Sequence, residues 1–431
     1  MINTPRLLRR SLLKIAGAGA GAAALAACGK DEPRADGPQT IKWWHISTTD
    51  PMLSIWASMA TAYQAAHANV KIEITTLENE AFKAKLTTVT QAGNPPDLFH
   101  TWGGGVLRQQ VDAGIVKDLT DGTSSWLNTL TPAAVQPYQF DGKTYGIPFD
   151  VGLIGFWYNK DLFARAGVTA APTTWADLLT AVGRLKGAGI TPIALAGKDK
   201  WPGHYYWAYL AMRVAGLPAL QQAATDKSFE NPDFVTAGVR LKELVDLKPF
   251  QKGFLAAEYG SPDGQAATMG NGGAAMELMG QWAPSVQNSS STSKKGIGDK
   301  LGFFTFPAVD GGKGAPTDAF GGGGGHAIGK GAPPATVDFL KFISQVDNQR
   351  TAAASGAVLP VAKGAEEAIK DPNLKVVAQA LATATGFQLY LDQAYPPAVG
   401  QQVNDSVAQL IAGTRSPEQV TSDITRVAKD Q

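Results

Sequence analysis

Cysteine is nearly absent from this chain of 431 residues, since Cys28 is the only one. A lone thiol cannot form a disulfide within the chain, so a disulfide-stapled scaffold is excluded. The five histidines do not have the spacing of a zinc site, and they stand at positions 45, 67, 100, 204 and 326. No G-x-S-x-G elbow is present either. We therefore expect no metal and no cofactor.

An excess of one charge is also missing. The chain has 38 Lys and Arg residues and 37 Asp and Glu residues. Four of the basic residues lie in a segment that we expect to be removed, namely Arg6, Arg9, Arg10 and Lys14. The mature chain then has 34 basic residues against 37 acidic ones. Binding to nucleic acid depends on an excess of positive charge beside the phosphates, so we expect no nucleic-acid partner.

Long hydrophobic runs are missing as well. The Ala/Gly-rich run 15–27 is too short and too weakly apolar to cross a bilayer core of about 30 Å as a helix. It follows Arg9 and Arg10, and small residues lead up to Cys28. A basic start, a short apolar run and small residues before a cut are typical of a secretory signal, which we predict over residues 1–27.

The end of this segment resembles a twin-arginine signal joined to a lipoprotein box, with Cys28 as the acylated residue. A disordered leader with an incidental cysteine is the alternative. A lipid thioether uses one cysteine without a partner, and two or more acyl chains give stable anchoring. Residues 28–39, rich in charge and proline, then form a flexible tether. We expect an exported protein that is lipid-anchored at the extracellular face of the cell membrane.

The periodicity of the remaining chain predicts an α/β fold. At 431 residues the chain exceeds the usual size of one hydrophobic core, which predicts two domains. Strand patterns alternate with helical patterns, the expected strands being 41–45, 70–74, 97–100, 191–196, 274–279 and 301–306. The order β-α-β-α-β at the start predicts a parallel sheet whose C-terminal loops are available for a ligand. A turn is expected at Asp141-Gly142, a surface loop over 287–299, and helices after 335.

The segment 145–163 has the pattern of a passage between two lobes. Two glycines and a proline break its first half, because they permit unusual backbone angles or fix φ. Residues 153–158 form a short apolar run, as expected of one strand that is covered on both faces. Asn159 is placed to cap a helix that Gly167 ends. We interpret the segment as a hinge crossing.

A second glycine-rich segment, 321–325, has two interpretations. Gly324, Gly329 and Lys330 match the opening of a P-loop, but Gly331 stands where Ser or Thr must ligate Mg²⁺. No clear strand precedes the run. We favour a close approach of backbone to backbone near a hinge.

Aromatic residues stand at several predicted strand ends, each beside glycine, proline or a polar group. They are Trp43 and Trp44 with His45, Trp102 with Gly103, Trp201 with Pro202 and His204, and Trp282 with Gln281, followed by the segment 388–393. A sugar site needs flat rings for the C–H faces of the ligand and polar groups for its hydroxyls. Each tryptophan can equally be a core anchor, and we favour the core for Trp43, Trp157 and Trp207. Taken singly, His45, His100 and His204 are also explained as structural residues.

An ordered set of motifs then gives a resemblance. The motifs are the lipobox, Asn94-Pro95-Pro96-Asp97-Leu98, Gly146-Ile147-Pro148-Phe149-Asp150 before Gly155-Phe156-Trp157-Tyr158-Asn159-Lys160, Pro172-Thr173-Thr174-Trp175, Ala275-Met276-Glu277-Leu278-Met279-Gly280-Gln281-Trp282, Phe306-Pro307 before Gly311-Gly312, and Ser355-Gly356 with Leu359-Pro360. Over nearly all of the mature sequence, the chain resembles the sugar-type extracellular solute-binding proteins of ABC importers. The finer resemblance is to members from high-GC Gram-positive bacteria that take up xylobiose or similar short oligosaccharides.

The resemblance implies a two-lobe, periplasmic-binding-protein-like α/β fold with three hinge crossings and an oligosaccharide in the cleft. Lobe 1 would comprise 40–150 and 304–355, and lobe 2 would comprise 151–303 and 356–431. The other two crossings are expected near 303–306 and 355–360. The implied partners are the oligosaccharide and the permease subunits of an ABC transporter, and we expect a monomer.

Applied to this sequence, the resemblance also implies eight ligand-binding residues: His45, Glu80, Trp102, Asp150, Trp201, His204, Trp282 and Asp392. Trp282 is the best supported, because the aromatic residue after Met-Gly-Gln stacks on sugar in relatives. We expect a receptor and not an enzyme. The rival interpretation is a secreted glycoside hydrolase or lyase, since the many acidic residues can offer the required pair of carboxylates. A metal receptor on a similar fold is disfavoured by the lack of clustered ligands.

Overall fold

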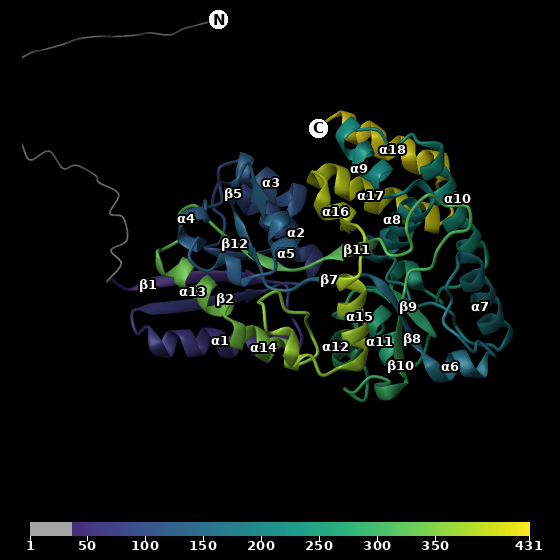
Figure 1. The fold of residues 1–431 in the computed structure, drawn as a ribbon, viewed down its shortest axis with the longest axis horizontal. Coiled ribbons are helices and arrows are strands. Elements are labelled where there is room, and N and C mark those ends of the chain that lie inside the picture. Colours follow the sequence, from purple (N-terminus) through teal and green to yellow (C-terminus); the bar gives the residue numbers. More distant parts are fainter. Residues whose placement is uncertain (1–36) are drawn as a thin grey trace, which may run out of the picture.

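The computed structural model describes residues 37–431. Cys28, the predicted signal peptide 1–27 and most of the predicted tether 28–39 lie outside the described residues. The described chain forms two lobes that lie side by side, with β7 (Gly152–Leu153) and β11 (Ala319–Gly322) between them (Figure 1). Each lobe combines a sheet with covering helices. The predicted two-lobe α/β fold is confirmed.

The first lobe is built on a five-stranded sheet in the order β2-β1-β3-β12-β6. Its strands are β1 (Gln39–His45), β2 (Val70–Thr76), β3 (Leu98–Thr101), β6 (Gly146–Pro148) and β12 (Gly325–Ile328), and a separate hairpin pairs β4 (Gln139–Phe140) with β5 (Lys143–Thr144). Its helices are α1 (Met52–Ala66), α2 (Asn79–Gln91), α3 (Gly104–Asp112), α4 (Thr120–Thr123), α5 (Pro132–Val135), α13 (Ala335–Ile343) and α14 (Val346–Ala354). The predicted parallel β-α-β-α-β start is present, because β1 pairs in parallel with both β2 and β3.

Alternating burial explains how this sheet is covered. Along β1, Ile41 and Trp43 are fully buried while their neighbours reach solvent. This face packs with α1 and α13 into one core. The opposite face packs Phe99 of β3 with Phe82 of α2 and Leu107 of α3 in a smaller core. Helices on both faces leave the carboxyl ends of β1 and β3 as the edge available for a ligand.

The second lobe has a three-stranded antiparallel sheet in the order β10-β8-β9. These strands are β8 (Gly155–Asn159), β9 (Met276–Met279) and β10 (Leu301–Thr305). Its helices are α6 (Lys160–Arg165), α7 (Trp175–Gly187), α8 (Trp201–Ala215), α9 (Leu217–Asp226), α10 (Pro232–Asp246), α11 (Gln265–Gly270), α12 (Ala283–Ser290), α15 (Pro372–Ala382), α16 (Leu391–Ala394), α17 (Pro397–Ile411) and α18 (Pro417–Lys429). Every residue of α8 is buried, so this helix runs through the middle of the lobe.

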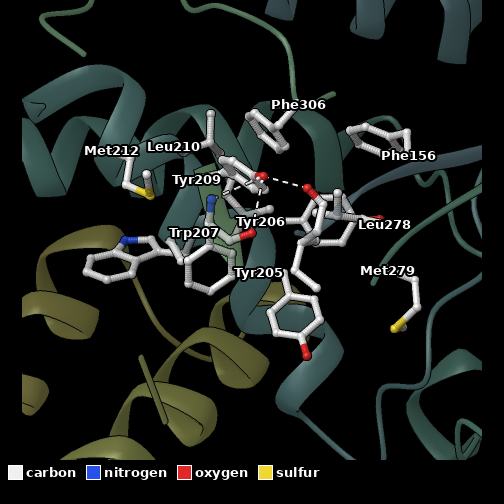
Figure 2. Packing of buried hydrophobic residues seen from close by; sticks show 14 of the residues in the cluster. Phe156, Tyr205, Tyr206, Trp207, Tyr209, Leu210, Met212, Leu278, Met279 and Phe306 are labelled. Atoms are coloured by element: carbon white, nitrogen blue, oxygen red, sulfur yellow. Dashed lines mark hydrogen bonds between the residues drawn. The ribbon is translucent and has the colours of Figure 1, made fainter. Parts of the chain in front are cut away.

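Figure 2 shows the packing around α8, where the Tyr209 ring lies beside Phe306. Its hydroxyl donates to the Ile154 carbonyl, and its ring stacks on Phe306 with centroids 4.5 Å apart. Trp207 on the same helix is fully buried, as Trp43 and Trp157 are. The prediction that these three tryptophans are core residues is confirmed.

A third small sheet, in the order β13-β11-β7, lies where the chain passes between the lobes. It joins β7 and β11 to β13 (Phe387–Leu389). The expected single strand over 153–158 is therefore wrong, because the chain changes sheets at Ile154. That residue donates its amide to the Phe320 carbonyl at 2.8 Å, between β7 in the connecting sheet and β8 in the second lobe. The apolar pattern could not reveal this change, since both halves are buried.

The glycine run 321–325 forms the end of β11 and the start of β12. A Cβ atom at Gly323 would lie 1.9 Å from the Asp150 carbonyl oxygen. One at Gly321 would lie 2.2 Å from the Gly152 oxygen, and one at Gly325 would lie 2.4 Å from the Ile147 oxygen. Two backbones thus touch without room for a side chain. The expected close approach near a hinge is confirmed.

The second crossing is not where we predicted it. The strand β10 pairs along its length with β8, and its residue Phe304 belongs to the second-lobe core. The chain crosses instead at the glycine run, after β11. A hydrophobic strand and a crossing strand share the same apolar pattern, so the sequence could not separate them. The expected lobe boundary at 304 is corrected accordingly.

The third crossing lies beside the first. Asp150 forms a bridge with Pro360, and Val151 donates to the Leu359 carbonyl at 3.0 Å. Val361, Ala362 and Ala365 pack in the first-lobe core, whereas Ile369 packs in the second. We propose a first lobe of 37–151 with 323–365 and a second lobe of 152–322 with 366–431.

Two of the predicted local features are present in the structure, and two differ from the prediction. Asn159 caps α6, since its side chain accepts from Asp161 N at 3.0 Å and from Leu162 N at 3.3 Å. The expected turn at Asp141-Gly142 is also present, with φ of 53° and 75°. The expected strand 191–196 forms only isolated bridges, through Ile193. The expected loop 287–299 begins inside α12, because Pro284 starts a helix there despite the serines that follow.

Among residues 37–431, no helix has the length and apolar character needed to cross a bilayer. The shorter turns of this part of the chain are the 3₁₀ segments η1 (Leu127–Thr129), η2 (Gln136–Tyr138), η3 (Phe254–Ala256), η4 (Gly298–Lys300) and η5 (Glu366–Ala368).

Candidate ligand-binding cleft

A cleft of about 260 Å³ lies between the two lobes. This volume is near the lower end of ligand pockets, about 300–1,000 Å³, so the cleft suits a small ligand and not a polymer. The first lobe contributes the loop 46–52 after β1, the start of α2, and Trp102 after β3. The second lobe contributes the start of α8, the turn after β9, and residues around α16. Loops at the carboxyl ends of strands thus meet across the lobe boundary.

Five of the eight predicted binding residues line this cleft, namely Trp102, Asp150, Trp201, Trp282 and Asp392. They come from five separate segments, which only the two-lobe fold brings together. Trp102 belongs to the first lobe and Asp150 to the crossing, while the other three belong to the second lobe. The set therefore spans both walls of the cleft.

The other three predicted residues do not reach the cleft surface. His45 is 1% exposed, and its Nδ1 accepts from the Ser47 amide at 3.3 Å. His204 is fully buried within α8, behind the cleft. Burial lowers the pKa of each of these imidazoles to about 4, so both are neutral at pH 7. Glu80 on α2 is not part of the cleft lining, and its Oε1 accepts from the Asn79 side chain at 2.9 Å and lies 3.4 Å from Nζ of Lys83. Its neighbours Glu78 and Asn79 line the cleft instead.

Aromatic rings form most of the second-lobe wall. Trp201 contacts Tyr259 edge-on with centroids 5.4 Å apart, and it lies 5.6 Å from the Tyr205 ring. Trp282 contacts Tyr390 edge-on at 6.3 Å. All five rings line the cleft. Edge-to-face contacts hold flat rings in fixed orientations, so this wall is prepared to stack on apolar faces of a ligand.

The Met-Gly-Gln-Trp motif has a steric explanation in the cleft. A Cβ atom at Gly280 would lie 2.1 Å from Cζ3 of the Trp282 ring, so only glycine allows the indole to fold back over the backbone. A Cβ atom at Gly152 would lie 1.7 Å from Oε1 of Gln281. The two glycines therefore make room for the two side chains that follow β9.

Asp150 connects the crossing with both lobes. Its Oδ1 accepts from the Gly324 amide, and its Oδ2 accepts from Nε2 of Gln281 at 3.0 Å. Burial raises the pKa of this carboxyl to about 6, although both hydrogen bonds favour its ionised form. The Oε1 of Gln281 is buried without a hydrogen-bond partner, which leaves an acceptor at the cleft floor.

The first-lobe wall contains two histidines that the sequence did not single out as cleft residues. His100 packs edge-on against Trp102 with centroids 4.5 Å apart, and His326 stands opposite His100 in the β3–β12 register. Burial lowers the pKa of His100 to about 3, with a further contribution from His45, and the pKa of His326 also lies well below its usual range. Nε2 of His100 and both ring nitrogens of His326 are buried without partners. Neutral imidazoles can donate and accept, as a hydroxyl does.

Further cleft residues were missed because their signals depend on the fold. Tyr205 lies on α8 after the predicted residues Trp201 and His204, Tyr259 lies in the loop before α11, and His326 reaches the cleft only through the antiparallel pairing of β12. Lys83 could have been found, since it lies one helical turn after the cleft-lining Asn79 on α2. Its ammonium lies 3.1 Å from Oδ2 of Asp392 on the opposite wall.

Carboxylates outnumber cations in the cleft lining. Asp50, Glu78, Asp150 and Asp392 line it together with a single basic residue, Lys83. Within residues 37–431, no group of three or more His, Cys, Asp or Glu residues is arranged to hold a metal ion. The chemistry of the cleft is thus stacking and hydrogen bonding, which suits a neutral ligand with many hydroxyls.

Comparisons with known proteins agree with this geometry. A family model described as bacterial extracellular solute-binding protein matches residues 46–350. The diacetylchitobiose binding protein DasA of Streptomyces coelicolor is 27% identical over 403 residues, which cover 88% of this chain and 88% of that protein. Two solved structures superpose with a TM-score of 0.82 each. One is a chitin oligosaccharide binding protein, 27% identical, with 91% of this chain and 99% of that chain covered. The other comes from work on xylan utilization by the thermophilic bacterium Caldanaerobius polysaccharolyticus, is 28% identical, and covers 90% of this chain and 99% of that chain.

Proposed function

The chain belongs to the family of bacterial extracellular solute-binding proteins, and from that premise we propose that it captures a short oligosaccharide for an ABC importer. Family members are receptors, so the prediction of a binding protein and not an enzyme is confirmed. The proposed ligand is xylobiose or a similar short oligosaccharide. The similarity to diacetylchitobiose and chitin oligosaccharide binding proteins makes a chitin disaccharide the first comparison ligand.

The observation that carries the proposal is the distribution of aromatic rings. Trp102 lines the cleft from the first lobe, while Trp201 and Trp282 line it from the second. A sugar that stacks on both walls makes its full set of contacts only when the lobes are close. Such a ligand shifts the population toward the closed form, which the permease can then recognise.

Calorimetry on the purified protein tests the ligand. We expect one-to-one binding of xylobiose, with diacetylchitobiose and maltose as comparisons, and no reaction products after prolonged incubation. Thermal shift against di- and trisaccharides provides a second measurement, because a ligand that binds only the folded state raises the melting temperature. Cleavage of the sugars would overturn the receptor proposal in favour of the hydrolase alternative. Binding of none of them would overturn the oligosaccharide class.

We also propose that Cys28 carries the lipid anchor and that the protein acts as a monomer at the outer face of the membrane. The lipobox before Cys28 supports the anchor. Radioactive palmitate fed to expressing cells should label the wild-type protein and not Cys28→Ser. Release of the variant into the medium is the matching result. Labelling that persists in Cys28→Ser would contradict the anchor.

A further inference from the structure

Lys83 and Asp392 join the two walls of the cleft. Lys83 lies on α2 of the first lobe, and Asp392 lies on α16 of the second. Lys83 Nζ is 3.1 Å from Asp392 Oδ2, and both residues line the cleft. Among the ion pairs of residues 37–431, this is the one that joins opposite cleft walls. Its position therefore couples the distance between the lobes to an electrostatic contact.

Each partner is held in place by its own lobe. The Asp392 side chain is 8% exposed, and its Oδ2 also accepts from Asn404 Nδ2 at 3.4 Å. A Cβ atom at Gly400 would lie 2.6 Å from the Asp392 carbonyl oxygen, so α17 packs directly on this backbone. The Lys83 ammonium lies 3.4 Å from Oε1 of Glu80 and 5.5 Å from the Trp102 ring centroid. Both charges thus occupy defined positions before any ligand contact.

Both partners are charged at neutral pH. Burial alone would lower the pKa of Lys83, but the carboxylates of Asp392 and Glu80 outweigh it and raise that pKa. Burial would likewise raise the pKa of Asp392, but the Lys83 charge outweighs it and the pKa is lowered. The Lys83 side chain is 26% exposed, so the pair lies between the exposed and the buried case. A partly desolvated pair is screened less by salt than a pair on the surface.

Opening of the lobes would remove this contact together with the close packing of α16 on α3, where a Cβ atom at Gly104 would lie 2.5 Å from the Gln393 carbonyl oxygen. Lys83 would keep Glu80, and Asp392 would keep Asn404, because those partners lie in the same lobe. The 3.1 Å contact itself exists only while α2 and α16 face each other. A contact that is present in one of two states stabilises that state relative to the other.

We propose that Lys83 and Asp392 form an interlobe latch, which stabilises the closed arrangement and presents the Lys83 ammonium to the ligand as a hydrogen-bond donor. An ammonium has three donor positions, and Asp392 and Glu80 occupy two of them. The third is available to an uncharged acceptor such as a sugar hydroxyl. The surplus of carboxylates in the cleft excludes an acidic sugar there. This second part rests on the proposed function, whereas the latch does not require a sugar.

The latch is tested without ligand by small-angle scattering and by the distance between one fluorophore on each lobe. Lys83→Met keeps the apolar stem over Trp102, and Asp392→Asn keeps the side-chain shape. We expect each variant to have a larger radius of gyration and a longer interlobe distance than wild type. The double variant should shift no further than either single one. Unchanged distances, or additive shifts, would overturn the latch.

Lys85→Met is the matched control, because Lys85 lies on the same helix, contacts the Trp44 ring at 4.3 Å and is not part of the cleft lining. It should leave the interlobe distance unchanged, and a shift equal to that of Lys83→Met would overturn the assignment to the ion pair. If Lys83→Met does not fold, Asp392→Asn with the same measurements decides the question.

The donor role is tested by calorimetry with xylobiose and diacetylchitobiose. Lys83→Met should weaken binding of whichever sugar the wild-type protein binds by about fivefold or more. A disaccharide in which glucuronic acid replaces one xylose should bind at least about tenfold more weakly than xylobiose. Equal affinities in either comparison would overturn the donor role. If the wild-type protein binds none of the di- and trisaccharides tested, the proposed function fails, while the scattering result still decides the latch.

Discussion

Trp282 depends on its neighbours for a defined position in the cleft. The missing side chain at Gly280 allows the indole to fold over the backbone, and the edge of Tyr390 supports it. Trp157, only one strand away, is fully buried and donates its Nε1 hydrogen to the Gly280 carbonyl at 3.0 Å. Trp157 thus stabilises the turn after β9, whereas Trp282 extends from this turn into the cleft. Residue type alone does not distinguish these two roles.

Replacing Trp282 by alanine is expected to weaken sugar binding by at least about 1.5 kcal/mol, the scale of a well-packed aromatic anchor. The physical reason is the loss of a flat stacking surface that is already held in position. Titration calorimetry with the sugar that the wild-type protein binds measures this change. Trp44→Ala is the control, because Trp44 packs outside the cleft against Lys85. Unchanged affinity in Trp282→Ala would remove Trp282 from the site.

Two buried charged side chains in the second lobe connect their own helix or strand to other segments of the lobe. Arg213 on α8 is 1% exposed, and its guanidinium donates to the carbonyls of Ala315, Asp318 and Pro316 at 2.9 to 3.0 Å. On β9, Glu277 is fully buried and accepts from Gln265 of α11 and from Gln287 of α12. Each group joins its element to segments that are distant in sequence, and each gives a testable consequence.

Arg213→Lys is expected to lower the free energy of unfolding of the second lobe by about 2 kcal/mol or more. A lysine cannot reproduce the planar fork, so buried carbonyls lose their partners at about 1–3 kcal/mol each. Urea unfolding followed by tryptophan fluorescence measures the loss. Arg240→Lys, in an exposed pair with Glu243, should change stability by no more than about 0.5 kcal/mol. Equal effects of the two substitutions would contradict this account of Arg213.

Glu277 is expected to make the second lobe less stable as the pH rises. Burial raises the pKa of Glu277 from 4.5 to about 7, so the protonated form favours the folded state. This contribution is fully present below about pH 4.5 and is lost as the pH rises through about 7, with a total of roughly 3 kcal/mol. The melting temperature should fall between pH 5 and pH 8. Glu277→Gln, which does not ionise, should lose most of that fall, and an identical pH dependence in this variant would disprove the assignment.

The whole molecule depends on how closely the chain segments pass one another between the lobes. The glycine run of the second crossing touches the backbone of the first crossing, and the segment ending at Pro360 pairs with Asp150 beside them. Rotation of the lobes must be absorbed by these few residues, because the elements on either side belong to separate packed cores. The same segments place Asp150 on the cleft. Binding and hinge geometry are therefore coupled at this point.

Gly323→Ala is expected to destabilise the protein by about 1–3 kcal/mol and to change the separation of the lobes, because its Cβ atom would overlap the Asp150 carbonyl oxygen. Thermal melting and small-angle scattering measure the two effects. Gly331→Ala is the control, since no atom lies within 4 Å of a Cβ atom at that position. If both variants match wild type in both measurements, the crossings do not require this close approach.

Much of the fold and part of the cleft followed from the sequence. The starts of the strands, the cap at Asn159 and the core position of Trp157 depend on residues close in sequence, and local periodicity expresses them. Five predicted cleft residues also line the cleft, because loops after strands meet at one edge. His45 and His204 were misplaced because the position of a residue at a strand or helix end does not give its burial. The crossing predicted at 303–306 was misplaced, because a buried strand has the same apolar sequence pattern whether it lies within one lobe or passes between two.

The sequence by itself determined the two-lobe α/β class, the family and the aromatic character of the site, because periodicity and ordered motifs are local properties of the chain. Only the tertiary structure decided which strand crosses between the lobes, which imidazoles lie at the cleft, and that Lys83 meets Asp392. The physical reason is that these facts depend on sheet pairing and lobe packing between residues hundreds of positions apart. Charges and rings act through space, and local sequence does not record which distant partner they will meet.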